Sequence, residues 1–253
     1  MNDNFQELII KNREFLKDSI RKSVDFSKTE QNNGVTVPPI QKPYPQTADL
    51  IDLDVEEDWE NIFNIPLARA VKNRVSRRNY SGDSLSLEEL SFLLWATQGV
   101  RLAEGNNTYR NVPSAGCRHS METYLAVFDV DELESGVYRY LPLSHRLILE
   151  FKDNELSEKL ITATFRQEFA GHSALTFMWT TIPNRMEWRY GPVSHKVIAM
   201  DAGHAAQNLY LACEAINSGT CAIAAYNQEY IDELLGLDGV DEFVIYLAPV
   251  GKI

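Results

Sequence analysis

Two neighbouring arginines, about a third of the way along the chain, give the clearest chemical signal in the sequence. Arg77 and Arg78 are followed directly by Asn79. A guanidinium can bond two phosphate oxygens at once, so arginine is a preferred side chain for holding a phosphate. The Asn79 amide adds a group that can meet a hydroxyl chain or a polar ring edge. The alternative is a solvated pair of charges beside a helix, which is the commoner role of two adjacent arginines.

Two other segments are short of bulky side chains. Pro113, Ser114, Ala115 and Gly116 follow one another, and residues 222–225 are Ala-Ile-Ala-Ala. A flat ring can stack on backbone only where side chains are small, and glycine permits the closest approach. An ordinary turn explains the first segment equally well, and close packing of a helix explains the second. Together with the arginines, they predict a site for a planar ring that carries a phosphate.

Arg189 and Tyr190 close a run of two arginines and two aromatic residues that is followed by Gly191 and Pro192. This run fits a lid over a ring, and it fits an amphipathic half-turn packed on a sheet at least as well. Arginine stays protonated and cannot act as a general base. Tyr190 can donate a proton, so these two residues are the candidates for a catalytic role.

No metal site and no nucleophile is predicted. The three cysteines, Cys117, Cys213 and Cys221, lack the spacing of a metal site, and their odd number favours reduced thiols in a cytoplasmic protein. None of the five histidines lies in a known ligand pattern. No serine lies in a nucleophile elbow.

The charge of the chain excludes two classes of partner. The net charge is −12 over 253 residues, and an acidic surface repels nucleic acid and anionic membranes. No apolar run is long enough to span a bilayer, and the N-terminus lacks the basic start and apolar block of a signal peptide. We therefore expect a cytoplasmic protein that binds neither nucleic acid nor membrane.

Residues 1–64 differ in character from the rest. Apolar residues recur at helical spacing over residues 3–22, which predicts an amphipathic helix. Four prolines within residues 37–45 exclude helix and central strand there and predict an extended arm. Residues 49–60 are acidic with alternating apolar residues, which favours a solvated edge strand or a loop. We expect the arm to wrap around another subunit.

Residues 65–253 are predicted to form the main domain. Ser86 and Glu89 form a capping box at the start of one helix, and Gly99 ends it. The other predicted helices cover residues 153–169, 195–217 and 227–236. The predicted strands cover residues 122–130, 136–140, 174–182, 220–226 and 242–250. Strands and helices mix without a regular βαβ repeat, which indicates an α+β fold. The long alanine-rich helix is suited to pack closely against a second copy of itself.

Residues 66–253 resemble the nitroreductase superfamily, and most closely a standalone member of its SagB-type branch, which includes azoline dehydrogenases of peptide-modifying pathways. The matching segments are residues 76–81, 112–116, 135–140, 201–209, 219–223, 234–237 and 247–252. The resemblance implies a nitroreductase-like α+β fold, with a central, mostly antiparallel sheet flanked by helices, in an intertwined homodimer. It also implies an FMN-dependent oxidoreductase, with the site at the dimer interface. NAD(P)H reduces the FMN, and a small nitro, quinone or similar substrate then takes the electrons.

The resemblance also assigns roles at the phosphate end of the cofactor. Arg77 would hold the FMN phosphate, while Arg78 and Asn79 would meet the ribityl chain or the pyrimidine edge. Lys252 would assist at the phosphate, with Gly251 beside it among the implied cofactor contacts.

Further roles concern the ring. Residues 113–116 would line it, and Ala224 and Ala225 would present a backbone N–H near the flavin N5. Ile223 belongs to the same set of implied cofactor contacts.

Two positions depart from the family pattern. Better-known nitroreductases carry a basic residue where this chain has about Ser81, so Arg189 or a residue of a partner chain is the candidate for stabilising the anionic reduced flavin. Azoline dehydrogenases have a Lys-Tyr pair where this chain has Arg189 and Tyr190. This departure counts against azoline oxidation. A tailoring dehydrogenase acting on a peptide heterocycle, a flavin-binding accessory protein without turnover and a structural homodimer without cofactor remain as alternatives.

Overall fold

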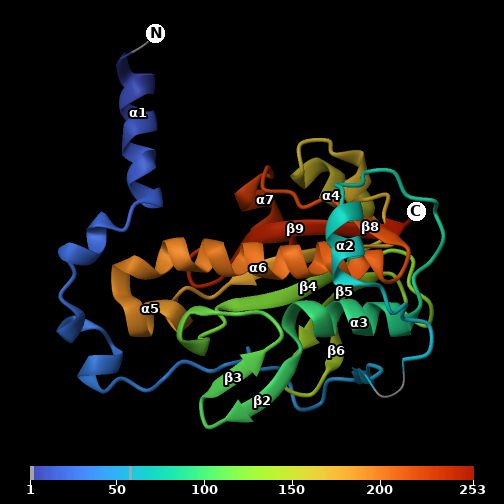
Figure 1. The fold of residues 1–253 in the computed structure, drawn as a ribbon, viewed down its shortest axis with the longest axis horizontal. Coiled ribbons are helices and arrows are strands. Elements are labelled where there is room, and N and C mark those ends of the chain that lie inside the picture. The colour runs from blue at the N-terminus through green and yellow to red at the C-terminus, as the bar shows by residue number, and fades with distance from the viewer. Residues whose placement is uncertain (1–2, 57–58) are drawn as a thin grey trace.

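The computed structural model describes residues 3–56 and 59–253, and a seven-stranded sheet forms its centre (Figure 1). The strand order is β1-β6-β5-β4-β7-β9-β8, and each neighbouring pair is antiparallel. The strands are β1 (Leu50–Asp52), β4 (Met121–Val127), β5 (Gly136–Leu141), β6 (Arg146–Phe151), β7 (Leu175–Thr181), β8 (Ser218–Thr220) and β9 (Phe243–Lys252). The α+β fold with an antiparallel sheet is therefore confirmed.

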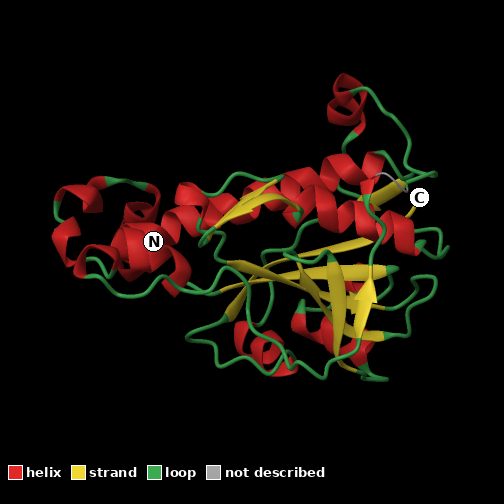
Figure 2. Cartoon of the chain, turned by 90° about the horizontal axis from the view of Figure 1, so that it is seen from below, coloured by secondary structure: helices red, strands yellow, loops and turns green. Residues whose placement is uncertain are grey.

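Helices cover both faces of this sheet (Figure 2). Helices α3 (Leu87–Gln98) and α6 (Ser194–Glu214) pack on one face, and α4 (Leu156–Ala163) and α7 (Gln228–Leu234) pack on the other. Every residue of β4 and of β7 is buried. A sheet covered on both faces needs apolar side chains on both sides of its central strands, which is why these two strands are almost uniformly apolar or small.

Several predicted elements occur as expected. The Ser86 hydroxyl accepts from the Glu89 N–H at 3.2 Å and the Glu89 carboxylate accepts from the Ser86 N–H at 3.0 Å, which is the predicted capping box. Asn227 caps α7 through Tyr230, as predicted. Helix α6 is continuous over 21 residues, with no break at Asp201. Strand β1 pairs only with β6, so the acidic segment does supply an edge strand.

Three predicted elements are shorter in the structure. The first helix, α1 (Asp3–Arg13), gives way to short 3-10 turns, and its apolar residues are exposed, with Phe5 59% and Ile10 58% accessible. Helix α4 ends at Ala163, before Phe165 and Arg166 adopt positive φ angles. The strand predicted for residues 220–226 is only β8, followed by irregular backbone.

The arm contacts the main domain of its own chain. In Figure 1 it leaves α1, which stands away from the main body, and runs along the lower edge of the domain. The Trp188 indole N–H donates to the Val35 carbonyl, the Arg110 guanidinium to the Ile40 carbonyl, and the Phe63 N–H to the Ala215 carbonyl. These contacts lie within one chain, so the expectation that the arm wraps around another subunit stays a prediction.

Five elements were not predicted or not bounded from the sequence: strand β6, α2 (Leu67–Asn73), α5 (Asn184–Tyr190) and the hairpin of β2 (Val100–Glu104) and β3 (Asn107–Arg110). The hairpin turns through Gly105, at φ +57°, and Asn106. Within the described residues, no helix has both the length and the apolar character needed to cross a bilayer.

Candidate functional site

The predicted phosphate-binding residues lie on an extended segment, residues 76–81, at the edge of the sheet. The Arg77 N–H donates to the Thr220 carbonyl at 3.0 Å, and the Ser81 N–H donates to the Lys252 carbonyl at 2.9 Å. Ser76 forms a parallel bridge with Thr220. Backbone pairing with β8 and the end of β9 therefore fixes this segment.

Two glycines let the segment lie so close to the strands. A Cβ added to Gly219 would overlap the Arg77 side chain, and one added to Gly251 would lie 2.6 Å from Cγ of Tyr80. Real Cβ atoms do not approach other atoms so closely, so both positions need glycine. Gly251, predicted as a cofactor contact, thus has a structural reason in the Tyr80 ring.

The side chains of this segment leave guanidinium groups without a carboxylate partner. Arg77 is half-buried, and its Nε has no hydrogen-bond partner within the described ranges. Arg78 is exposed, with its guanidinium 5.7 Å from the centre of the Phe169 ring, and Asn79 is exposed beside it. A groove of about 410 Å³ is lined by residues 75–81 and Ile253. In a protein of net charge −12, these groups form a site suited to an anion.

The Lys252 side chain, which was predicted to assist at the phosphate, is bound by other groups. Its ammonium forms an ion pair with Glu89, and it donates to the Ile216 carbonyl at 2.9 Å. The Glu89 carboxylate therefore balances this charge, and among the residues that the structure describes, Arg77 and Arg78 have no carboxylate partner. At Ser81, the position where the resemblance led us to expect a basic residue, the hydroxyl donates to the Asp83 carboxylate at 2.8 Å.

Of the three residues predicted near the ring, one is buried and fixed by backbone hydrogen bonds, and two are exposed. Ile223 is buried, its N–H donates to the Leu247 carbonyl at 2.8 Å, and its carbonyl accepts from the Leu247 N–H at 3.2 Å. Ala224 and Ala225 are exposed, and in the part of the chain that the structure describes, their N–H groups have no hydrogen-bond partner. Ile223 therefore positions the backbone, and the two alanines present free donors.

Residues 113–118 form a strained loop against α5. Gly116, Cys117 and His119 have φ angles of +58°, +55° and +43°, a region that side chains other than glycine seldom adopt. A Cβ on Gly116 would lie 2.6 Å from the Tyr190 hydroxyl and 3.1 Å from Cδ of Arg189. The structure thus brings together the predicted loop and both predicted catalytic residues.

Asp201 in α6 contacts this loop. It was not among the site residues predicted from the sequence. It is buried in α6, and burial raises the pKa of its carboxyl, while the Ser114 hydroxyl and the Ala115 N–H act to lower it. Its Oδ2 has no hydrogen-bond partner within the described residues. A lone acid on the buried face of an alanine-rich helix is the signal that could have identified it.

His119, just after the loop, is held neutral. Burial, and then the charge of Arg110, lower its pKa to about 3, although the Thr108 carbonyl opposes this shift. Its ring Nε2 lies 3.1 Å from that carbonyl. A neutral, buried imidazole is not available for proton transfer. No group of three or more His, Cys, Asp or Glu side chains suited to a metal ion occurs within residues 3–56 and 59–253.

Helix α5 carries Arg189 and Tyr190 at its end. Arg185, Met186 and Trp188 are buried, whereas Arg189 is exposed, with its guanidinium 5.6 Å from the Tyr190 ring centre. Of the two interpretations of this run, the packed amphipathic one describes it better than a free lid.

One chain does not bring all the predicted residues together. The Tyr210 hydroxyl lies 3.1 Å from the Ser76 hydroxyl and accepts from the Ala222 N–H at 2.9 Å, which links it to the arginine segment. Asp201 contacts Ser114 and Ala115 nine residues earlier in α6. Nine residues of helix correspond to about 13 Å. We call the arginine segment and the 113–118 loop the two half-sites, because they meet α6 about 13 Å apart.

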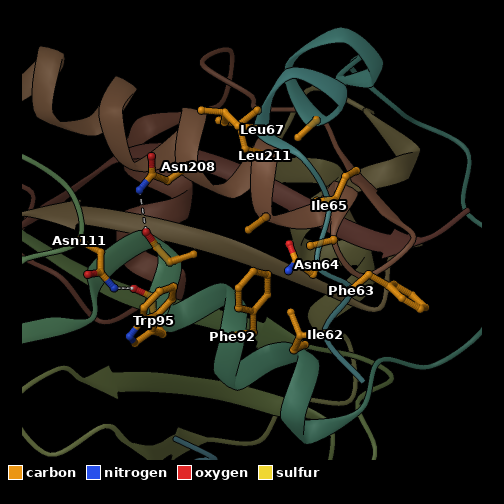
Figure 3. A pocket seen from close by; sticks show the side chains of 14 residues that line it. Ile62, Phe63, Asn64, Ile65, Leu67, Phe92, Trp95, Asn111, Asn208 and Leu211 are labelled. Atoms are coloured by element: carbon orange, nitrogen blue, oxygen red, sulfur yellow. Dashed lines mark hydrogen bonds between the residues drawn. The ribbon is translucent and has the colours of Figure 1, made fainter. Parts of the chain in front are cut away.

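A larger groove contains none of the predicted site residues. Helices α2, α3 and α6 and residues 62–65 line about 490 Å³ with apolar side chains and three asparagines (Figure 3). Asn111 donates to the Trp95 carbonyl and Asn208 to the Ala96 carbonyl, each at 2.8 Å. No acid or base lines this groove, so it is an apolar surface rather than a place for proton transfer.

Comparison with known proteins gives a consistent result. The model of the nitroreductase family matches residues 71–252. The nitroreductase homologue MJ1384 of Methanocaldococcus jannaschii is 32% identical over 198 residues, which cover 78% of this chain and 96% of that protein. The trifolitoxin-processing protein TfxB of Rhizobium leguminosarum is 28% identical over 62% of this chain, which spans only 44% of TfxB.

Solved structures with the same fold include three informative cases. A nitroreductase homologue from Ralstonia eutropha has a TM-score of 0.66 and 25% identity, covering 86% of this chain and 98% of that chain. One from Anabaena variabilis has a TM-score of 0.67 and 24% identity, and this chain spans 44% of it. A chain of the Escherichia coli microcin synthetase McbBCD complex covers all of this chain at a TM-score of 0.61 and 18% identity.

Proposed function

Because the chain belongs to the nitroreductase family, an oxidoreductase family, we propose that it is an FMN-dependent oxidoreductase that passes electrons from NAD(P)H to a small electrophilic substrate, such as a nitro compound or a quinone. One observation carries the proposal. Two unpaired guanidinium groups, Arg77 and Arg78, share one edge of the molecule with the free N–H groups of Ala224 and Ala225.

These residues fit FMN in their chemistry. The Arg77 Nε is a buried donor without a partner in the described residues, and a phosphate oxygen would satisfy it. The Gln167 amide donates to the Ala225 carbonyl at 3.1 Å, and Phe169 lies under the Arg78 guanidinium. The segment 167–169 therefore links the proposed phosphate end to the proposed ring end.

When bound, FMN supplies the capacity to accept a hydride and to pass two electrons on. The residues of this chain have distinct proposed tasks. Arg77 holds the phosphate, and Arg78 and Asn79 hold the polar chain. The N–H groups of Ala224 and Ala225 orient the ring edge. The Tyr190 hydroxyl donates a proton to the substrate, and the Arg189 guanidinium stabilises negative charge beside it.

A homodimer explains the two separate half-sites. The exposed face of α6 includes Met200, Gly203 and His204, and nothing lies within 4 Å of a Cβ built on Gly203. Such a face allows a second α6 to approach closely. A second copy of the chain would bring its own residues 113–116 towards the arginine segment of the first.

The visible absorption spectrum of the purified protein tests the cofactor, followed by identification of the chromophore released on heating. We expect a yellow protein that releases FMN and is bleached by NADH or NADPH. Flavin that binds but is reduced by neither nucleotide would instead favour an accessory protein without turnover. A colourless protein that takes up no added FMN would contradict the proposal.

A second candidate is a tailoring dehydrogenase of the SagB type. The similarity to TfxB and to a chain of the McbBCD complex favours it. Arg189, in place of the lysine found in azoline dehydrogenases, counts against it, since a guanidinium cannot accept a proton. Incubating the flavin-loaded protein with a thiazoline-containing peptide would decide: loss of two hydrogen atoms, seen by mass spectrometry, would support this function, and an unchanged mass would argue against it.

A further inference from the structure

We propose that residues 29–43 of the arm, the strap, are part of the reaction site, because they hold α5 and thereby position Arg189 and Tyr190 against the 113–118 loop. This inference rests on the proposed function, in which those two residues act on the substrate. It assigns positioning roles to Lys42, Arg185 and Trp188.

Buried charged side chains of the main domain bind the strap through its backbone. The Arg110 guanidinium donates to the Ile40 carbonyl at 3.1 Å. The Arg139 guanidinium donates to the carbonyls of Lys42 at 3.0 Å and of Pro43 at 3.2 Å. The Glu122 carboxylate accepts from the Lys42 N–H at 2.8 Å. Hydrogen bonds to charged groups are stronger than neutral ones, so this end of the strap is firmly fixed.

The Lys42 side chain adds a second attachment. Its ammonium lies 2.5 Å from the Glu242 carboxylate and 2.8 Å from the Tyr124 hydroxyl. Glu242 in turn accepts from the Thr180 hydroxyl at 2.7 Å. The strap is thereby attached to β4, β7 and the start of β9, the centre of the sheet.

The other end of the strap holds α5 along its length. The Trp188 indole N–H donates to the Val35 carbonyl at 2.9 Å, and the Asn184 amide donates to the Glu30 carboxylate at 3.2 Å. Arg185 donates at 2.5 Å to Oε1 of Glu122, the same oxygen that accepts from Lys42. One buried carboxylate therefore joins the strap to α5.

Helix α5 needs such support. It has seven residues, and isolated helices of that length are unstable because nucleation is costly. Its C-terminal end contacts the loop through Tyr190 and Arg189 at Gly116, and the Arg118 guanidinium lies 5.3 Å from the Trp188 ring centre. A loop with positive φ angles at Gly116 and Cys117, followed by a third at His119, persists only where its surroundings hold it. If the strap moved, both α5 and the 113–118 loop would therefore lose their support.

Two variants of the full-length protein test the inference. Lys42→Met removes the ammonium from the strap without touching α5, and Trp188→Phe removes the bond to Val35 while keeping an aromatic ring beside Arg118. Trp59→Phe is the matched control, because the Trp59 indole N–H has no partner in the described residues. Amide hydrogen exchange of residues 29–43, 113–118 and 184–191 is measured by mass spectrometry, which needs no flavin. The kcat and KM for NADH and NADPH are then measured with FMN added.

We expect exchange of residues 184–191 and 113–118 to become about threefold to tenfold faster in both variants and to stay unchanged in Trp59→Phe, as the loss of one hydrogen bond predicts. We expect kcat to fall about as much, with FMN retention unchanged. Faster exchange confined to residues 29–43 in Lys42→Met, with residues 113–118 and 184–191 unchanged in both variants, would overturn the inference. If no flavin binds at all, the proposed function fails, and the exchange result still decides the role of the strap.

Discussion

Residues 76–81, the arginine segment, and the 113–118 loop with α5 are held in place by opposite kinds of contact. Backbone pairing with β8 and β9 holds residues 76–81, and Gly219 and Gly251 leave room for it. Its charged side chains remain free. At the loop, buried charged side chains such as Arg185 and Glu122 are used for support, while Arg189 stays exposed.

This difference separates stability from ligand binding. Removing a side chain from the arginine segment takes away a contact for a ligand and leaves the backbone pairing in place. Removing one from beneath the loop leaves an unpaired charge in the protein interior, which is costly. The following tests address this contrast.

The largest expected effect comes from Glu122→Ala. It leaves Arg185 and Arg139 without their shared buried carboxylate, so we expect the free energy of unfolding to fall by about 3–5 kcal/mol. Urea denaturation measures this. Glu150→Ala is the control, because Glu150 pairs with Arg139 near the surface and leaves Glu122 in place. Equal losses of unfolding free energy in the two variants would contradict the idea that the buried carboxylate matters more for stability than the one near the surface.

A second test uses pH. The pKa of His119 lies near 3 in the folded protein, below its usual value of about 6.5, so the unfolded chain binds more protons between these two values. Stability is therefore lost as the pH falls below about 6.5, by up to about 1.4 kcal/mol for each pH unit. Denaturation curves at pH 7, 6, 5 and 4.5 measure the slope. His119→Gln should show a shallower slope, and an unchanged slope would show that His119 is not the group responsible.

The smallest expected effect is on the arginine segment. Arg77→Ala should weaken FMN binding about tenfold to a hundredfold, because one charge-assisted contact is lost, while the urea midpoint stays nearly unchanged. Flavin fluorescence titration measures the affinity. Arg69→Ala, which removes an exposed arginine of α2, should keep full affinity. Full flavin occupancy in Arg77→Ala would count against the site.

Local signals made much of the fold predictable. The capping box at Ser86 and Glu89, the Asn227 cap and the apolar period of α6 each depend on residues within a few positions of one another. The hairpin carried a signal of the same kind, since Gly105 and Asn106 form a two-residue turn between β2 and β3, and this signal was missed.

Long-range contacts explain the remaining errors. The path of the arm depends on Arg110, Glu122 and Arg139, which lie 70 to 97 positions away from the backbone atoms they bind. Lys252 and Glu89, which form an ion pair, lie 163 positions apart in the sequence. No short pattern encodes such pairs. The assignment of the arginines and small residues to the site stays a prediction, and it starts from residue types, because a guanidinium or a small side chain carries its chemistry in any fold.

The way the strap is bound also affects how its sequence can evolve. Arg110 and Arg139 contact carbonyl groups, and Glu122 accepts from an N–H, so these three side chains recognise the course of the main chain and not the side chains of Ile40 and Pro43. Ile40 and Pro43 can therefore be replaced across species while the path is inherited, provided that Lys42 keeps its place, since its ammonium contacts Glu242 and Tyr124. Homologous straps should diverge in sequence faster than the buried arginines and glutamate that bind them.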